Sequence, residues 1–196
     1  ETRTYAYFIA EWLNRNKDRF DVVALQEVFL GILGVGDKIR GKYRQRDHYR
    51  VFSGYQSFVE HGVGFAAFRY QNLLLSHLPK LSDSAFNYLL PGKVAFLASS
   101  GFTLAPFLFH DQTVWIGNTH LHAYNPEARM RQAKSIAKVV NSLHGAPIIF
   151  LGDLNTVPPG CRDSDFPAGE RDVNSYKGDR SLSILNDAGL NIIDHR

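Results

Sequence analysis

Two short segments of the chain place polar side chains directly after apolar runs. They read Asn118-Thr119-His120-Leu121 and Gly152-Asp153-Leu154-Asn155. Asn118 and His120 are two positions apart, and so are Asp153 and Asn155, so on an extended chain the members of each pair point to the same side. A carboxylate, two carboxamides and an imidazole gathered at strand ends would suit a phosphate ester and a divalent metal ion.

Asp153 and Asn155 allow a chemical interpretation and a structural one. The carboxylate could orient a water molecule or bind a metal ion, and Asn155 could donate to a phosphate oxygen that gains charge in the transition state. Gly152, just before them, permits a close backbone approach or an unusual dihedral angle. Asp and Asn are also common turn residues, so an Asp-Leu-Asn turn explains the same segment equally well.

Glu27 and His120 are the other candidates for chemistry. Glu27 follows the apolar run 22–25, and Mg²⁺ prefers one or two carboxylates with water and phosphate oxygens, although spacing alone favours an ordinary strand-end glutamate. His120 could donate to a phosphoryl oxygen or take part in proton transfer. With His122 it could instead form half of a zinc site. We do not favour zinc, because it needs further ligands and Cys161 is the only thiol.

The composition is that of an ordinary globular protein. The chain has 196 residues, of which 44% are hydrophobic and 21% charged, and its formal net charge of +3 is too small to argue for nucleic-acid binding by itself. A single cysteine rules out an intrachain disulfide. No apolar run reaches the roughly 18 residues that a membrane-spanning helix needs. We therefore expect one domain over residues 1–196.

Apolar periodicity predicts strands with intervening helices, and hence an α/β domain. The predicted helices cover residues 5–13, with Tyr5, Phe8, Ile9, Trp12 and Leu13 as the apolar face, 125–145, with Asn125 as N-cap, and 180–188. The predicted strands cover residues 22–25, ending at Gln26-Glu27, and residues 51–52, 64–68, 73–75, 94–98, 102–109, 114–117 and 147–151. A loop followed by a basic helix is expected within residues 29–49, and a further loop at 157–178.

The basic stretch at residues 38–46 has two interpretations. With Tyr43 inside it, the stretch resembles a patch that binds a phosphate backbone. We favour a solvated helix face, because Asp37 and Asp47 flank it. The glycines at 31–36 form no phosphate-binding loop, because no Gly-Lys-Ser/Thr follows. No Gly-x-Ser-x-Gly segment is present, which argues against a serine hydrolase of that kind.

Four segments, taken in order, resemble the endonuclease/exonuclease/phosphatase superfamily of metal-dependent phosphoesterases. They are Asp21-Val22-Val23-Ala24-Leu25-Gln26-Glu27-Val28, then Gly62-Val63-Gly64-Phe65 leading to Leu75-Ser76-His77-Leu78-Pro79, then Asn118-Thr119-His120-Leu121 and Gly152-Asp153-Leu154-Asn155. Each motif is short, but the four follow the family order and cover nearly the whole chain. In this context a functional role for Glu27 and Asp153 is favoured over a structural one.

The resemblance implies a fold and a set of roles. The fold is a two-sheet α/β sandwich of the DNase I-like kind, with helices outside both sheets and the site at one edge. Glu27 would be a Mg²⁺ ligand, Asp153 would align or activate the attacking water with Asn155 as its partner at the phosphate, and His120 would contact the phosphate. Asn118 is expected to orient its strand end and to contribute to substrate binding. The implied reaction is in-line attack of water on a phosphoester.

Within the superfamily, the segment 119–125 looks most like the neutral sphingomyelinase branch. There a similar segment precedes a helix that carries Arg and Gln, here Arg131 and Gln132. The aromatic-rich middle of the chain suits contact with a membrane-surface lipid, and equally an ordinary sandwich core. The resemblance therefore implies a Mg²⁺-dependent sphingomyelin phosphodiesterase.

Other functions stay open. They are a nuclease or deadenylase, which the basic stretch 38–50 supports, a phosphoinositide phosphatase, and a non-catalytic relative that binds a phosphate-bearing ligand or a protein. Nucleic acid is the less favoured partner. Neither the compartment nor the oligomeric state follows from the sequence.

Two segments of the family pattern are missing from this chain. The family normally begins with a strand that ends in an asparagine, and it normally ends with Ser-Asp-His. Asp194-His195 resembles the latter, but it follows Asp153 too soon and no predicted strand intervenes, so we do not expect His195 to be the catalytic histidine. We therefore expect a partial domain that lacks its first and last strands and is weakly active or inactive by itself.

Overall fold

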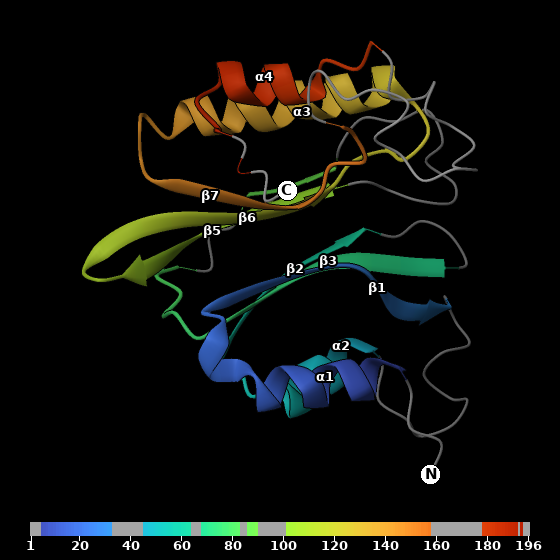
Figure 1. The fold of residues 1–196 in the computed structure, drawn as a ribbon, viewed down its shortest axis with the longest axis vertical. Helices are drawn as coiled ribbons and strands as arrows, with labels where there is room; N and C mark the ends of the chain where they lie inside the picture. The colour runs from blue at the N-terminus through green and yellow to red at the C-terminus, as the bar shows by residue number, and fades with distance from the viewer. Residues whose placement is uncertain are drawn as a thin grey trace.

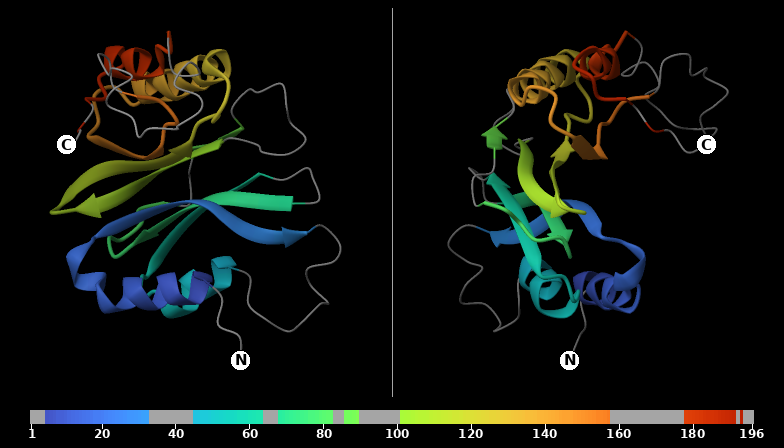
Figure 2. Two further views of the ribbon diagram at one scale, coloured as in Figure 1. Left: turned by 45° about the vertical axis from the view of Figure 1, so that its right-hand side comes forward. Right: turned by 90° about the vertical axis from the view of Figure 1, so that its left-hand side faces the viewer.

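Two β-sheets lie face to face in the computed structural model, and helices cover the outer face of each (Figure 1). The structure describes residues 5–32, 45–63, 68–82, 86–89, 101–157, 178–191 and 193. The views in Figure 2 show the same succession of helices, sheet, sheet and helices. The predicted two-sheet α/β sandwich is thereby confirmed.

The first sheet is the lower one in Figure 1, and its three strands run antiparallel in the order β1-β3-β2. Its strands are β1 at Val22–Ile32, β2 at Ser57–Val63 and β3 at Phe68–Ser76. Two helices cover its outer face, α1 at Tyr5–Arg15 and α2 at Gln45–Phe52. A 3-10 helix, η1 at Lys17–Arg19, leads from α1 to β1.

The second sheet has the order β4-β5-β6-β7. Its strands are β4 at Phe86–Leu89, β5 at Gly101–Phe109, β6 at Gln112–His120 and β7 at Ile148–Asp153. Among the described strands of this sheet, β6 and β7 pair in parallel and the other pairs are antiparallel. The long helix α3, at Pro126–Ser142, connects these two strands, and α4, at Ser181–Asp187, lies beside it on the outer face.

Apolar side chains fill the space between each pair of neighbouring layers. Leu73, Leu74 and Leu75 in β3 are all fully buried, because successive side chains of a strand alternate between its two faces and both faces are covered. Leu73 and Leu75 pack in the cluster beneath α1 and α2, whereas Leu74 packs between the sheets. From the second sheet, the inter-sheet layer receives Ala105, Phe107, Val114 and Ile116.

Helix α3 forms as the sequence predicts. Asn125 accepts a hydrogen bond through Oδ1 from the backbone N–H of Ala128 at 3.0 Å, and Pro126 stands at the first helical position. Gly145, with a φ of 80°, follows the end of the helix. Because α3 joins two parallel strands, both strands deliver their carboxyl ends to one edge of the sheet.

Two strand predictions are wrong. β1 does not end at Gln26-Glu27 but continues to Ile32, because its pairing with β3 resumes after an irregularity. Residues 51–52 are not a strand but the last turn of α2. Tyr49 and Phe52 both pack in the cluster between the helices and the first sheet. A spacing of three places them on one face of a helix, but on opposite faces of a strand.

The predicted apolar face of α1 is also wrong, although the helix itself is confirmed. Leu13 is buried as expected, but Tyr5, Phe8, Ile9 and Trp12 are exposed. Ala6 and Ala10 complete the buried face. The spacing of four and three residues is helical, and small alanine side chains let the helix lie close to the sheet.

Several predictions fall outside the described residues. These are the strands at 94–98 and, apart from Phe68, at 64–68, most of the basic stretch 38–46, nearly all of the loop 157–178, and Asp194-His195. Among the described helices, none combines the length and the apolar character needed to cross a membrane.

Candidate active site

His120 and Asp153 are neighbours at the carboxyl ends of the two parallel strands. They are register partners in β6 and β7, and His120 Nε2 lies 3.9 Å from Asp153 Oδ2. α/β sheets commonly bind ligands at the carboxyl ends of their parallel strands. The structure therefore brings these two predicted site residues together.

Glu27 reaches the same place from the opposite sheet. Its Oε1 lies 3.9 Å from His120 Nδ1, so the imidazole stands between two carboxylates. The side chains of Glu27 and Asp153 are 71% and 55% exposed, and that of His120 is 24% exposed. Both separations exceed a hydrogen bond. The carboxylates therefore flank the imidazole and are open to solvent.

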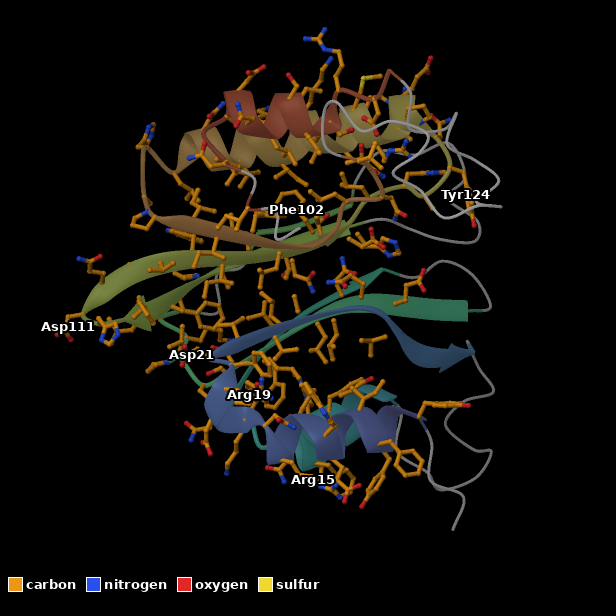
Figure 3. All side chains as sticks on the ribbon, in the orientation of Figure 1. Arg15, Arg19, Asp21, Phe102, Asp111 and Tyr124 are labelled. Atoms are coloured by element: carbon orange, nitrogen blue, oxygen red, sulfur yellow. The ribbon has the colours of Figure 1, made fainter. Side chains whose placement is uncertain are left out.

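The two-residue repeat of β6 explains why the side chain of His120 reaches the edge of the inter-sheet layer. Along one face of β6, Ile116 lies in the apolar core, Asn118 is fully buried and His120 is partly exposed. On β1, the inter-sheet residue Ala24 is followed two positions later by Gln26. The loop after β6, marked by Tyr124 in Figure 3, lies at the opposite edge of the molecule from Asp21 and Asp111.

Asn118 lies inside the protein and not on the surface of the site. Its side chain is 0% exposed. Its Nδ2 donates to the carbonyl oxygens of Leu25 and Leu73 at 3.0 and 3.2 Å, and its Oδ1 accepts from Gln26 Nε2 at 2.7 Å. This geometry favours the expected role of orienting the strand end and does not favour direct contact with a substrate.

Asp153 and Asn155 form a turn, and the Asp153 carboxylate also faces His120. Asp153 Oδ1 accepts from the backbone N–H of Asn155 at 2.8 Å, as in an Asp-type turn. Asn155 Nδ2 donates to the Leu121 carbonyl at 2.8 Å. Gly152 has a φ of 139°, the unusual dihedral angle that the sequence allowed for. The structural and chemical interpretations of this segment are therefore compatible.

Two side chains of α3 form hydrogen bonds with the loop after His120. Gln132 Oε1 accepts from the His122 backbone N–H at 2.8 Å, and Arg129 Nη1 donates to the carbonyls of His122 and Ala123, both at 2.9 Å. Arg129 also forms a buried ion pair with Asp179, which precedes α4. These contacts set the path of the chain next to the site.

Arg129 and Asp179 are residues that the sequence reasoning missed. The sequence pattern pointed instead to Arg131, which is exposed and whose Nη1 lies 3.7 Å from Glu127 Oε2. A signal was available, because Arg129 precedes the buried Ala133 by four positions and therefore lies on the buried stripe of the helix. Asp179 falls in a region where the sequence predicted only a loop followed by a helix.

Two pKa values near the site depart from the ordinary range. Burial, and then the positive charge of Arg129, lower the pKa of His122. Burial by itself would raise the pKa of Asp179, but hydrogen bonds from Ser181 and Arg129 outweigh it and hold this pKa below its usual value. These shifts favour a neutral His122 imidazole and an ionised Asp179 carboxylate in the folded loop.

The donor set fits magnesium better than zinc. Mg²⁺ keeps several waters and is often held by one or two carboxylates plus substrate phosphates, and Glu27 supplies an exposed carboxylate. No group of three or more His, Cys, Asp and Glu side chains suited to a metal occurs within the described ranges. His122 Nδ1 already accepts from the backbone N–H groups of Tyr124 and Asn125, both at 3.2 Å. A zinc site built on His120 and His122 is therefore not favoured.

Solved structures of similar fold exist. One from Beutenbergia cavernae, described as an endonuclease/exonuclease/phosphatase, has a TM-score of 0.63 at 16% identity and covers 96% of this chain and 48% of its own. A humanised D. rerio TDP2 has a TM-score of 0.56 at 18% identity, and the match covers 84% of this chain and 64% of the TDP2 chain. ANGEL2, a 2′,3′-cyclic phosphatase solved with adenosine-2′,3′-vanadate, has a TM-score of 0.55 at 17% identity, with 80% and 46% covered.

This chain thus spans between about half and two-thirds of the length of those structures. A comparison with curated proteins found no match. The model of the Endonuclease/Exonuclease/phosphatase family matches residues 6–175, which include all five predicted site residues. The chain belongs to this family of phosphoesterases.

Proposed function

We propose that this protein is a Mg²⁺-dependent phosphoesterase that hydrolyses a phosphodiester by in-line attack of water. The observation that carries the proposal is the imidazole of His120, which stands 3.9 Å from each of two exposed carboxylates at the edge of the sandwich. Glu27 would hold the metal ion together with water and phosphate oxygens. Bound Mg²⁺ would supply positive charge to the phosphoryl oxygens.

Each of the other side chains has a role that its contacts support. Asp153 would orient the attacking water and accept its proton, since the Asn155 N–H holds Oδ1 and Oδ2 faces His120. His120 would donate a hydrogen bond to a non-bridging phosphate oxygen. One amide hydrogen of Asn155 is used on Leu121, which leaves the second for the phosphate.

For the substrate we propose sphingomyelin. The resemblance of residues 119–125 to the neutral sphingomyelinases supports this choice. Tyr124, in the same segment, is 79% exposed, and an aromatic face suits the quaternary ammonium of a choline group. The aromatic-rich middle of the chain adds little support, because Phe102 and Phe107 are fully buried.

A nucleotide phosphodiester is the second candidate substrate. ANGEL2, which is similar in fold, is a 2′,3′-cyclic phosphatase that was solved with an adenosine vanadate. An exposed tyrosine in the loop after His120 would stack on a base as readily as it would contact choline.

The test is a hydrolysis assay of this chain, expressed together with whatever coding sequence flanks it. Sphingomyelin vesicles and a single-stranded oligonucleotide are offered with Mg²⁺ and with a chelator. Asp153→Asn is the site variant, and Asp111→Asn, the same change in the exposed turn at the far edge, is the control. We expect Mg²⁺-dependent release of phosphocholine, reduced about 10²- to 10⁴-fold by Asp153→Asn and unchanged by Asp111→Asn.

Cleavage of the oligonucleotide instead would keep the chemistry and replace the substrate. Hydrolysis that survives the chelator would contradict the role of the metal, and hydrolysis that survives Asp153→Asn would contradict the role of this carboxylate. Binding of either substrate without turnover would favour the non-catalytic relative.

A further inference from the structure

Glu27 has a left-handed backbone in the middle of a strand. Its φ is 56°, whereas the other described non-glycine residues with positive φ lie outside the strands: His110 and Asp111 in the β5–β6 turn, His144 after α3, and Asn155 after β7. The pairing of β1 with β3 passes from Leu25–Leu73 to Val28–Gln71, so Gln26 and Glu27 together face one residue, Asn72. This is a β-bulge, and bulges commonly re-aim a side chain next to an active site.

A left-handed glutamate persists only where the surrounding structure holds it, because this backbone conformation is unfavourable for residues other than glycine. Asn72, directly opposite, donates its amide to Gly101 in the second sheet at 2.9 Å. The bulge itself is contacted from the second sheet by Asn118 of β6.

The side chain of Asn118 forms three hydrogen bonds at the start of the bulge. Nδ2 donates to the carbonyls of Leu25 and Leu73, which are the last regular pair before the irregularity. Oδ1 accepts from the side chain of Gln26, the first residue of the bulge. The fully buried carboxamide of Asn118 therefore connects the peptide that leads into Glu27 with the strand that carries His120.

We propose that Asn118 is a positioning residue that, through Leu25 and Gln26, holds the Glu27 carboxylate in place to bind a divalent cation. This inference rests on the proposed function, in which Glu27 binds the metal. It assigns to Asn118 an action through Glu27 and no contact with the substrate. Groups that orient a metal ligand without touching the metal typically change metal affinity about 10- to 100-fold when they are removed.

The test measures the Kd for Mn²⁺ alone, by water-proton relaxation, together with thermal melting of each variant. Glu27→Gln tests the ligand itself, and Asn118→Ala and Gln26→Ala test its support. Ser76→Ala is the control, because Ser76 is equally buried and its Oγ accepts from Leu78 N–H at 2.9 Å at the far end of β3. If Asn118→Ala fails to fold, Gln26→Ala decides, since Gln26 is only partly buried.

We expect Glu27→Gln to abolish specific Mn²⁺ binding, and Asn118→Ala and Gln26→Ala to raise the Kd about tenfold or more. Ser76→Ala should lower the melting temperature and leave the Kd at the wild-type value. Wild-type affinity in both Asn118→Ala and Gln26→Ala, with binding lost in Glu27→Gln, would overturn the inference alone. Wild-type affinity in Glu27→Gln would overturn the proposed metal role, and the inference with it.

Discussion

The His122 imidazole is held in one tautomer by the backbone around it. Its Nδ1 accepts from the N–H groups of Tyr124 and Asn125, so in the neutral ring the proton must reside on Nε2. Protonation of Nδ1 would place a hydrogen against two donors. The positive charge that faces the ring is Arg129, whose partner is Asp179. This loop therefore disfavours a charged His122.

From the lowered pKa of His122 we predict that acid destabilises the fold. The unfolded chain binds a proton here at a higher pH than the folded one, so this contribution to stability is complete above about pH 6.5 and decreases as the pH falls below that value. The measurement is the free energy of unfolding in urea between pH 7.5 and 5.5. In His122→Asn, which keeps an acceptor that does not titrate, the decrease should be smaller.

His110→Asn is the matched control for this prediction. His110 is exposed in the turn between β5 and β6 with a φ of 44°, which asparagine also tolerates. The pH dependence of this variant should follow the wild type. Equal pH dependence in His122→Asn and the wild type would refute the proposed role of the His122 ring.

What the sequence could reveal about single residues depended on where their partners lie. His120, Asp153 and Glu27 were named as candidates because each follows an apolar run, and the four motifs in family order then favoured a functional role for Glu27 and Asp153. The contacts of Asn118 were not, because Gln26 is 92 positions away and the two meet only when the sheets stack. The positive φ of Glu27 was also hidden, since glutamate is not a residue that signals a left-handed backbone.

Among the elements, β6 and β7 depend on Gly152, the register partner of Thr119. A Cβ on Gly152 would lie 2.0 Å from the carbonyl oxygen of Thr119, and the φ of 139° is itself unfavourable for other residues. We predict that Gly152→Ala pushes β7 from β6, separates Asp153 from His120 and destabilises the chain by several kcal/mol, at the upper end of single substitutions. Urea unfolding measures the stability, and the proposed hydrolysis should be lost.

Gly145→Ala is the control for this clash. Gly145 also has a positive φ, 80°, but a Cβ there would meet nothing within 4 Å. It should therefore cost only the backbone strain, about 1–2 kcal/mol. If the two variants were equally stable, close contact between the strands would not be the reason for glycine at 152.

The elements themselves were predictable to the extent that local rules decide them. Helix α3 has a cap, a proline and a terminal glycine, and each signal is local. Residues 51–52 were misassigned because two β-prone side chains outweighed the three-residue spacing of Tyr49 and Phe52, whose shared apolar cluster only the fold supplies. The face of α1 was misassigned because the largest apolar side chains do not pack against the sheet.

For the whole molecule, the two-sheet sandwich followed from four motifs in order and not from composition, which fits many folds. The layering then explains the site, because residues from both sheets reach one edge only when the sheets are stacked. The buried pair of Arg129 and Asp179, 50 positions apart, joins the loop after β6 to the segment before α4. No local pattern identifies such a pair.

We predict that Asp179→Asn destabilises the protein by about 3–5 kcal/mol at pH 7, because it removes the negative charge that Asp179 places against the buried guanidinium of Arg129. The depressed pKa of Asp179 gives the sign of the pH dependence. Its stabilisation is complete above the unfolded pKa of about 4 and is lost as the pH falls through the lower folded pKa. The difference between wild type and variant in urea unfolding should therefore be constant near neutrality and shrink below about pH 4.

Two further variants separate charge from packing. Asp187→Asn makes the same change at an exposed position at the end of α4, and it should alter stability by less than about 0.5 kcal/mol. Arg129→Met with Asp179→Leu removes both charges, and it should recover much of the stability that Asp179→Asn loses, since a well-packed apolar pair often replaces a buried ion pair without cost. If the double variant is stable but the proposed hydrolysis falls, the pair serves to hold the loop beside His120. If stability and hydrolysis are both retained, the bond that Gln132 accepts from His122 and the bond that Asn155 donates to Leu121 suffice to hold that loop.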